Sequence, residues 1–139
     1  MKYLIALLLC SAPCIAQTDL KTERLQKIQA VHTIFVDGNN VGALKAREQI
    51  EKGKTCFTLA LKAADADAVF AVGTDSQMED ARWGIRDYIV TGTLTNKDGE
   101  LLWSQNSRFG DAPFSNGGKE AAKILVHMLK REACEGKRR

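Results

Sequence analysis

The stretch IRDYIVTGTLTNKDGELLWSQNS, residues 85–107, decides the fold. Its first half alternates apolar and polar residues, with Val90 and Leu94 on one side, as expected of a half-buried strand. The turn sequence NKDG follows, and its glycine supplies the positive φ that a tight hairpin requires. The chain then returns with Leu101 and Trp103 on one side. The stretch therefore predicts an antiparallel hairpin of two strands.

Three short apolar runs before this hairpin predict further strands. They are residues 28–36, 55–61 and 68–72. The intervening KAADAD is expected to form a turn or a single helical turn. The segments on either side of the hairpin, residues 74–84 and 108–116, are polar and are expected to be irregular.

Two segments have the periodicity of an amphipathic helix. The first follows Asn40, a good N-cap residue, and ends before Gly53, which suits the position after a helix. The second covers residues 117–133. Its predicted buried stripe is Ala121, Ile124, Leu125, Met128 and Leu129. Its predicted water-facing residues are Lys123, His127 and Lys130.

These elements follow the order β-α-β-β-β-β-α and predict the α+β class. We expect a mixed sheet of about five strands with two helices packed on one face. The 139 residues are enough for one domain, which we place at residues 28–134. Residues 17–27 are expected to form a flexible lead-in, and residues 135–139 a basic tail.

Residues 1–16 have the pattern of a secretory signal peptide. Lys2 precedes an apolar run, and the small residues Cys14 and Ala16 stand at the positions that favour cleavage before Gln17. The apolar run is too short to cross a bilayer, and no later segment is long enough. We therefore expect a periplasmic or secreted protein without a membrane span.

Lipid attachment is the alternative form of export. A lipoprotein signal places a small residue directly before the modified cysteine. Here Pro13 precedes Cys14, and Leu9 precedes Cys10. Neither pair fits, so lipid anchoring is not favoured.

Cys56 and Cys134 remain after the expected cleavage. An even pair of cysteines in an oxidising compartment predicts one disulfide. A helix that continued through Cys134 would point this residue away from its apolar stripe. Two separate thiols are therefore the alternative.

Charge argues against nucleic acid as a partner. The chain has 20 basic and 17 acidic residues, a formal net charge of +3. Four of the basic residues are Lys2 and the last three residues of the tail. The rest of the chain therefore carries about −1, whereas a nucleic-acid-binding domain needs a basic face.

Several phrases of the sequence together resemble a known group of proteins. They are VDG at residues 36–38, CF at 56–57, ADADAVFAV at 64–72, YIVTGTLTNKDGELLWS at 88–104, and the closing alanine-rich helix. The pattern resembles small exported bacterial domains grouped with the TolB amino-terminal domain and CsgG-like envelope proteins. The resemblance implies protein–protein contact and assembly at the envelope, and it implies no catalytic residues. Unlike those families, this sequence has no pattern of a β-propeller domain or of pore-forming hairpins.

Residues with possible chemistry have simpler structural interpretations. His32 and His127 have no neighbours at metal-ligand spacing, so we expect neither a metal nor a cofactor. Asp65 and Asp67 could form a carboxylate pair, but aspartate is common in such turns. The sequence DGNN at residues 37–40 joins a strand to a helix and is explained by capping.

Two segments carry the candidate binding residues. Arg82 and Trp83 belong to one polar segment, and Phe109 and Phe114 to a second. Arginine and tryptophan are frequent at interface hot spots, and exposed aromatics on loops favour recognition. The leading hypothesis is a non-enzymatic envelope module that binds a protein partner. The alternative is a small-ligand or glycan-binding module that uses these aromatic residues.

Overall fold

A computed structural model describes residues 14–80, 85–111 and 116–135. At its centre lies an antiparallel ladder of β3 (Ala68–Asp80), β4 (Ile85–Asn96) and β5 (Leu101–Asp111). β1 (Thr33–Asp37) and β2 (Thr58–Leu59) extend it by parallel pairing, in the order β2-β1-β3-β4-β5. The predicted mixed sheet of five strands is confirmed.

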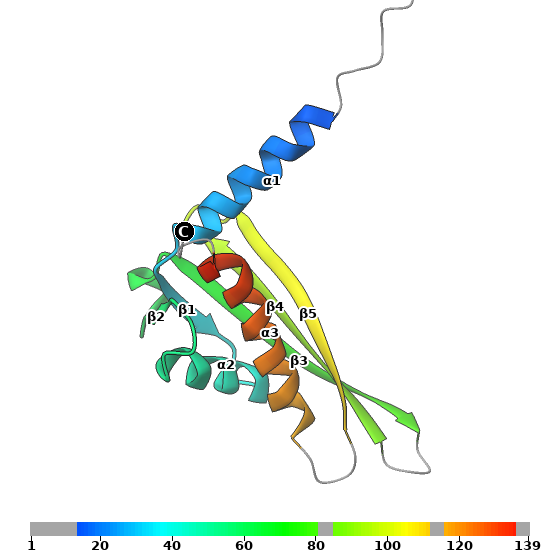
Figure 1. The fold of residues 1–139 in the computed structure, drawn as a ribbon. Helices are drawn as coiled ribbons and strands as arrows, with labels where there is room; N and C mark the ends of the chain where they lie inside the picture. The colour runs from blue at the N-terminus through cyan, green and yellow to red at the C-terminus, as the bar shows by residue number, and fades with distance from the viewer. Residues whose placement is uncertain (1–13, 81–84, 112–115, 136–139) are drawn as a thin grey trace, which may run out of the picture.

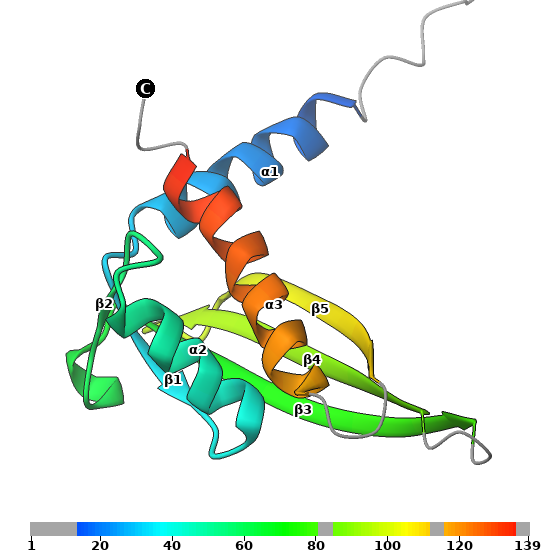
Figure 2. The same ribbon diagram turned by 60° about the horizontal axis from the view of Figure 1, so that its bottom comes forward.

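Helices α2 (Val41–Glu51) and α3 (Gly117–Cys134) pack side by side on one face of this sheet (Figures 1 and 2). The predicted α+β class and the order of these elements are therefore confirmed. The expected turn before β3 is the short 3₁₀ helix η1 (Ala63–Asp65).

A further helix, α1 (Cys14–Gln29), covers the segment expected to be a loose lead-in. The predicted strand at residues 28–36 accordingly begins only at Thr33. α1 contacts the rest of the domain through its last turn, where Ile28 is buried, whereas Leu20 is 65% exposed. Of residues 19–29, only those in this last turn are buried or half-buried, so these positions lack the continuous apolar stripe from which a helix could be predicted.

The hairpin contains a register shift that changes which residues are buried. Leu94 pairs with Trp103, but the next residue of β4, Thr95, pairs with Leu101. β5 therefore holds one extra residue, a β-bulge, which turns both Leu102 and Trp103 into the core. The prediction that Leu101 shares a face with Trp103 is wrong, and Leu101 is 48% exposed.

The core lies between the sheet and the two packed helices. Phe70, Leu94 and Trp103 form one row across β3, β4 and β5, and the rings of Phe70 and Trp103 are 6.0 Å apart. Gly92 lies beneath α3, where an added Cβ would come within 2.8 Å of Leu125 Cδ2. The missing side chain at this position allows α3 to approach the sheet.

β3 and β5 are longer than predicted. The polar residues 74–80 continue β3, and residues 108–111 continue β5, where loops were expected. Both extensions pair with β4 in regular antiparallel register up to a bulge near Met78. Thr74 still contacts the start of α2 through the Gly42 N–H, but the residues after it lack the apolar alternation that marks a half-buried strand.

Both ends of α2 are capped as predicted. The Asn40 side chain accepts a hydrogen bond from the Ala43 N–H at 2.9 Å and donates one to the Val72 carbonyl. At the other end, Gly53 has φ +65 and its N–H bonds to the Ile50 carbonyl. The Lys54 N–H bonds to the Gln49 carbonyl, which completes a Schellman motif.

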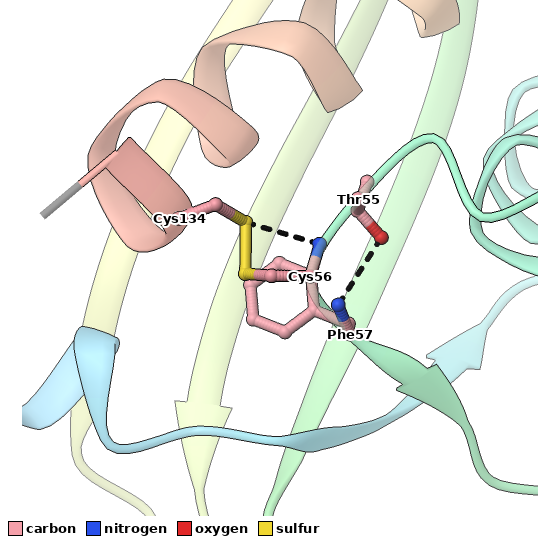
Figure 3. Close-up of a disulfide and its surroundings, with 4 residues drawn as sticks. All are labelled: Thr55, Cys56, Phe57 and Cys134. Atoms are coloured by element: carbon pink, nitrogen blue, oxygen red, sulfur yellow. Dashed lines mark hydrogen bonds between the residues drawn. A yellow bond between two sulfur atoms is a disulfide. The ribbon is translucent and has the colours of Figure 1, made fainter. Parts of the chain in front are cut away.

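The structure contains the predicted disulfide between Cys56 and Cys134 (Figure 3). It joins the segment between α2 and β2 to the last turn of α3. α3 continues through Cys134, so the helix did not have to end early for the bond to form. Cys134 lies on the side of α3 that the sequence predicts to be polar. The segment that carries Cys56 passes over this side, so the two cysteines meet.

Asp67 has a structural role at the start of β1. Its carboxylate accepts hydrogen bonds from the backbone N–H groups of Thr33 at 2.8 Å and His32 at 3.0 Å. These bonds, that of Thr33 first, lower the pKa of the Asp67 carboxyl below its ordinary value of 3.8. Asp65, the other member of the candidate pair, is exposed in η1.

We predict that Asp67→Asn lowers the free energy of unfolding at pH 7 by on the order of 1 kcal/mol, because the bonds to a charged acceptor weaken. The stabilisation from Asp67 is complete above the ordinary carboxyl pKa and is lost as pH falls through the lowered pKa. Urea unfolding should therefore show the difference from wild type shrinking in acid. Asp65→Asn is the matched control, and an equal loss for both variants would contradict this role.

Candidate interaction surface

The long strands extend past the point at which α3 begins (Figures 1 and 2). A Cβ placed on Gly118, in the first turn of α3, would lie 3.5 Å from Tyr88 and 3.7 Å from Thr74. Residues 75–80, 85–88 and 108–111 lie at or beyond this level, and we call them the distal ribbon. Of its residues whose burial is described, most are exposed, whereas Asp87 is buried and Tyr88 is half-buried.

An apolar side chain is exposed on the distal ribbon. Phe109 pairs with Tyr88 across β4 and β5, so both rings project from the face on which α3 lies. Tyr88 is half-buried beside the start of α3, whereas Phe109 is 36% exposed. Phe109 is the one candidate binding residue that the structure describes.

An ion pair crosses the opposite face of the distal ribbon. The Arg108 guanidinium donates a hydrogen bond to the carboxylate of Asp87 on the neighbouring strand. The Asp87 side chain is 4% exposed and that of Arg108 is 59% exposed. A buried carboxylate requires such a partner, because an unpaired charge is costly to remove from water. The sequence reasoning did not identify this pair.

Arg82, Trp83 and Phe114 lie outside the described residues. The strand ends next to them are described, and the register pairs Asp80 with Ile85 and Arg86 with Asp111. The segments that carry the four candidate residues therefore connect to the same end of the sheet. Their grouping into one binding surface remains a prediction.

A cleft of about 500 Å³ lies between α1, β5 and the end of α3. Its lining includes Lys21, Arg24 and Leu25 of α1, Trp103 and Gln105 of β5, and Glu132 of α3. The buried indole Nε1 of Trp103 has no hydrogen-bond acceptor among the described residues. The sequence could not reveal this cleft, because α1 and the bulge in β5 were not predicted.

The remaining chemical candidates lie apart from one another. His32 precedes β1, and His127 lies on the exposed side of α3. Within the residues that the structure describes, no three histidine, cysteine, aspartate or glutamate side chains are grouped so as to hold a metal. The helices of the described segments also lack the length and apolar character needed to cross a bilayer.

Comparison with known proteins relates the chain to others by fold. No protein-family profile matches it, and no similar curated protein is found. A PelC dodecamer from Paraburkholderia phytofirmans, carrying one substitution, has a TM-score of 0.53 and 15% identity, covering 75% of this chain and 87% of that chain. A second crystal of the PelC dodecamer has a TM-score of 0.52 and 13% identity, covering 73% and 86%.

A minor lipoprotein from Acinetobacter baumannii has a TM-score of 0.48 and 10% identity, covering 76% of this chain and 90% of that chain. At such low identities the comparison with PelC establishes a similar fold and nothing further. The resemblance to the TolB amino-terminal domain and CsgG-like proteins remains a prediction from the sequence.

We predict that Arg108→Ala lowers the free energy of unfolding by about 2 kcal/mol, because it leaves the Asp87 carboxylate buried without its guanidinium. Adding Asp87→Asn should recover part of this loss, since an amide carries no charge. Arg86→Ala, an exposed arginine on the adjacent β4 position, should change stability by less than about 0.5 kcal/mol. Urea unfolding of the four proteins measures this, and equal losses for Arg86→Ala and Arg108→Ala would refute the assignment.

Proposed function

We propose that this protein is a non-enzymatic, exported module of the bacterial cell envelope that acts by binding another protein. Two features support export. The first is the signal-peptide pattern of residues 1–16, with cleavage before Gln17. The second is the disulfide between Cys56 and Cys134, because such bonds persist in oxidising compartments.

The distal ribbon is the observation on which the proposed binding role depends. It presents a three-stranded edge of the sheet beyond the packed helices, with Phe109 exposed on it. An exposed aromatic on a rigid strand loses little conformational entropy on binding, which favours it as an interface anchor. Arg82, Trp83 and Phe114 would add to the same surface, because their segments connect to this end of the sheet.

The partner proposed here includes further copies of this chain. PelC, whose fold is similar, crystallised as a dodecamer. β5 is an edge strand of 11 residues, and an unpaired edge is a ready template for contact with another chain. Self-association and binding of a different envelope protein must therefore be measured separately.

We predict that Phe109→Ser lowers the recovery of a specific partner at least tenfold, while the lost cross-strand contact with Tyr88 lowers the melting temperature by only a few degrees. The measurement is a pull-down of the tagged protein from lightly crosslinked native envelope, quantified by mass spectrometry. Trp83→Ala should have the same effect. Native mass spectrometry of the purified mature protein reports self-association of the same variants.

Leu61→Ser is the matched control, because Leu61 is 89% exposed and follows β2 at the opposite edge of the sheet. It should leave both recovery and self-association unchanged. If Phe109→Ser, Trp83→Ala and Leu61→Ser all retain every partner, the distal ribbon is not the interface and the proposed function loses its main support.

The alternative function is binding of a small ligand or a glycan. The cleft beside α1 favours it, since about 500 Å³ is within the usual range for ligand sites and Trp103 forms part of its wall. This site differs from the one that the sequence predicted for the alternative. A ligand screen in which Gln105→Ala weakens binding, combined with a pull-down without partners, would favour this function.

A further inference from the structure

A second concave surface lies between α2 and α3, on the side of the helices away from the sheet. It is a groove of about 390 Å³. Lys54, Lys123 and Lys130 line it together with His127 and Gln49. None of the described residues that line this groove carries a carboxylate. Three ammonium groups from two parts of the chain therefore surround one space.

Two lysines of α3 and its histidine follow a single stripe. Lys123, His127, Lys130 and Cys134 are separated by four, three and four residues, so they lie on one side of the helix. The sequence predicted the first three to face water. The disulfide at Cys134 brings a second wall against this stripe, and the stripe becomes one side of the groove.

Two constraints hold the backbone at Lys54 in the opposite wall of the groove. The Schellman motif at the end of α2 bonds its backbone N–H to the Gln49 carbonyl at 3.1 Å. Two residues further on, Cys56 is bonded covalently to Cys134, one turn beyond Lys130 (Figure 3). The fold thus keeps Lys54 near Lys130 in spite of the repulsion between two like charges.

The carboxylates of Glu48 and Glu120 are paired with other lysines. Glu48 lies between Lys45 and Lys52, and these two ammonium groups lower the pKa of its carboxyl to about 2. Glu120 pairs with Lys123 at 2.5 Å. Across the described segments, no ion pair holds Lys54 or Lys130. Their positive charge remains available to a ligand.

An exposed apolar side chain accompanies these charges. Ile124, which the sequence placed in the buried stripe of α3, is instead 42% exposed and lines the groove. Val126 also lines the groove and is buried. An exposed isoleucine among lysines offers a ligand both an apolar contact and an anion site.

We propose that the groove between α2 and α3 binds an anionic amphiphile, a molecule that carries a phosphate or carboxylate group on an apolar body. Lys54 and Lys130 hold the anionic group, and Ile124 contacts the apolar part. This site lies on the helices, apart from the distal ribbon, and its test is independent of the proposed function.

The test uses the purified mature protein and three probes. They are lysophosphatidylglycerol, lysophosphatidylcholine with the same acyl chain, and inorganic phosphate. Both lipid probes are kept below their critical micellar concentrations. We expect calorimetric titration to show the tightest binding for lysophosphatidylglycerol. The double variant K54E/K130E should weaken it at least tenfold, and raising the salt concentration should weaken it as well.

The matched control is K62E/K97E, which changes the net charge equally at exposed lysines outside the groove. It should bind as wild type does. K54Q/K130Q provides a milder test if the charge-reversed protein does not fold. Equal affinity for the two lipids would overturn the anion site, and equal affinity for inorganic phosphate would overturn the apolar contact. No binding of any probe would overturn the proposal, as would equal weakening in both double variants.

Discussion

The disulfide between Cys56 and Cys134 is the constraint on which the arrangement of the helices depends. It closes a loop between residues 78 positions apart, which in the chain-entropy account stabilises the fold by about 4 kcal/mol. It also fixes the segment after α2 against the last turn of α3. A domain of this size has limited stability to spare, so this contribution is a large fraction of the total. The same bond holds together the two walls of the groove between α2 and α3.

The helices cover only part of the sheet, and this unequal coverage separates two kinds of surface. Beneath α2 and α3, Phe70, Leu94 and Trp103 form a continuous core row. Beyond the start of α3, the same strands continue as the distal ribbon, whose face away from the helices carries the ion pair of Asp87 and Arg108. Backbone pairing continues through the ribbon, and its exposed side chains, Phe109 among them, are available to a partner. This division is the physical basis of the proposed binding role.

Features set by local chemistry were predictable from the sequence. The Asn40 cap, the glycine at position 53 and the NKDG turn each depend on a few adjacent residues. Several features set by distant contacts were not, although the disulfide was. α1 is held by the burial of Ile28 and by the ion pair of Lys27 with Glu100, and the bulge before Trp103 depends on register with β4. Of the candidate site, the sequence identified Phe109. It missed Arg108 because its partner Asp87 lies on another strand.

Export into an oxidising compartment is the central claim of this account, since both the disulfide and the proposed envelope role require it. The most direct test is to block free thiols in intact cells, isolate the protein and measure its intact mass. The account predicts a chain that begins at Gln17 and carries no blocking group, because Cys56 and Cys134 are bonded. A full-length chain blocked at all four cysteines would contradict export and the disulfide together. A mass that includes acyl chains on Cys14 would contradict the predicted cleavage site.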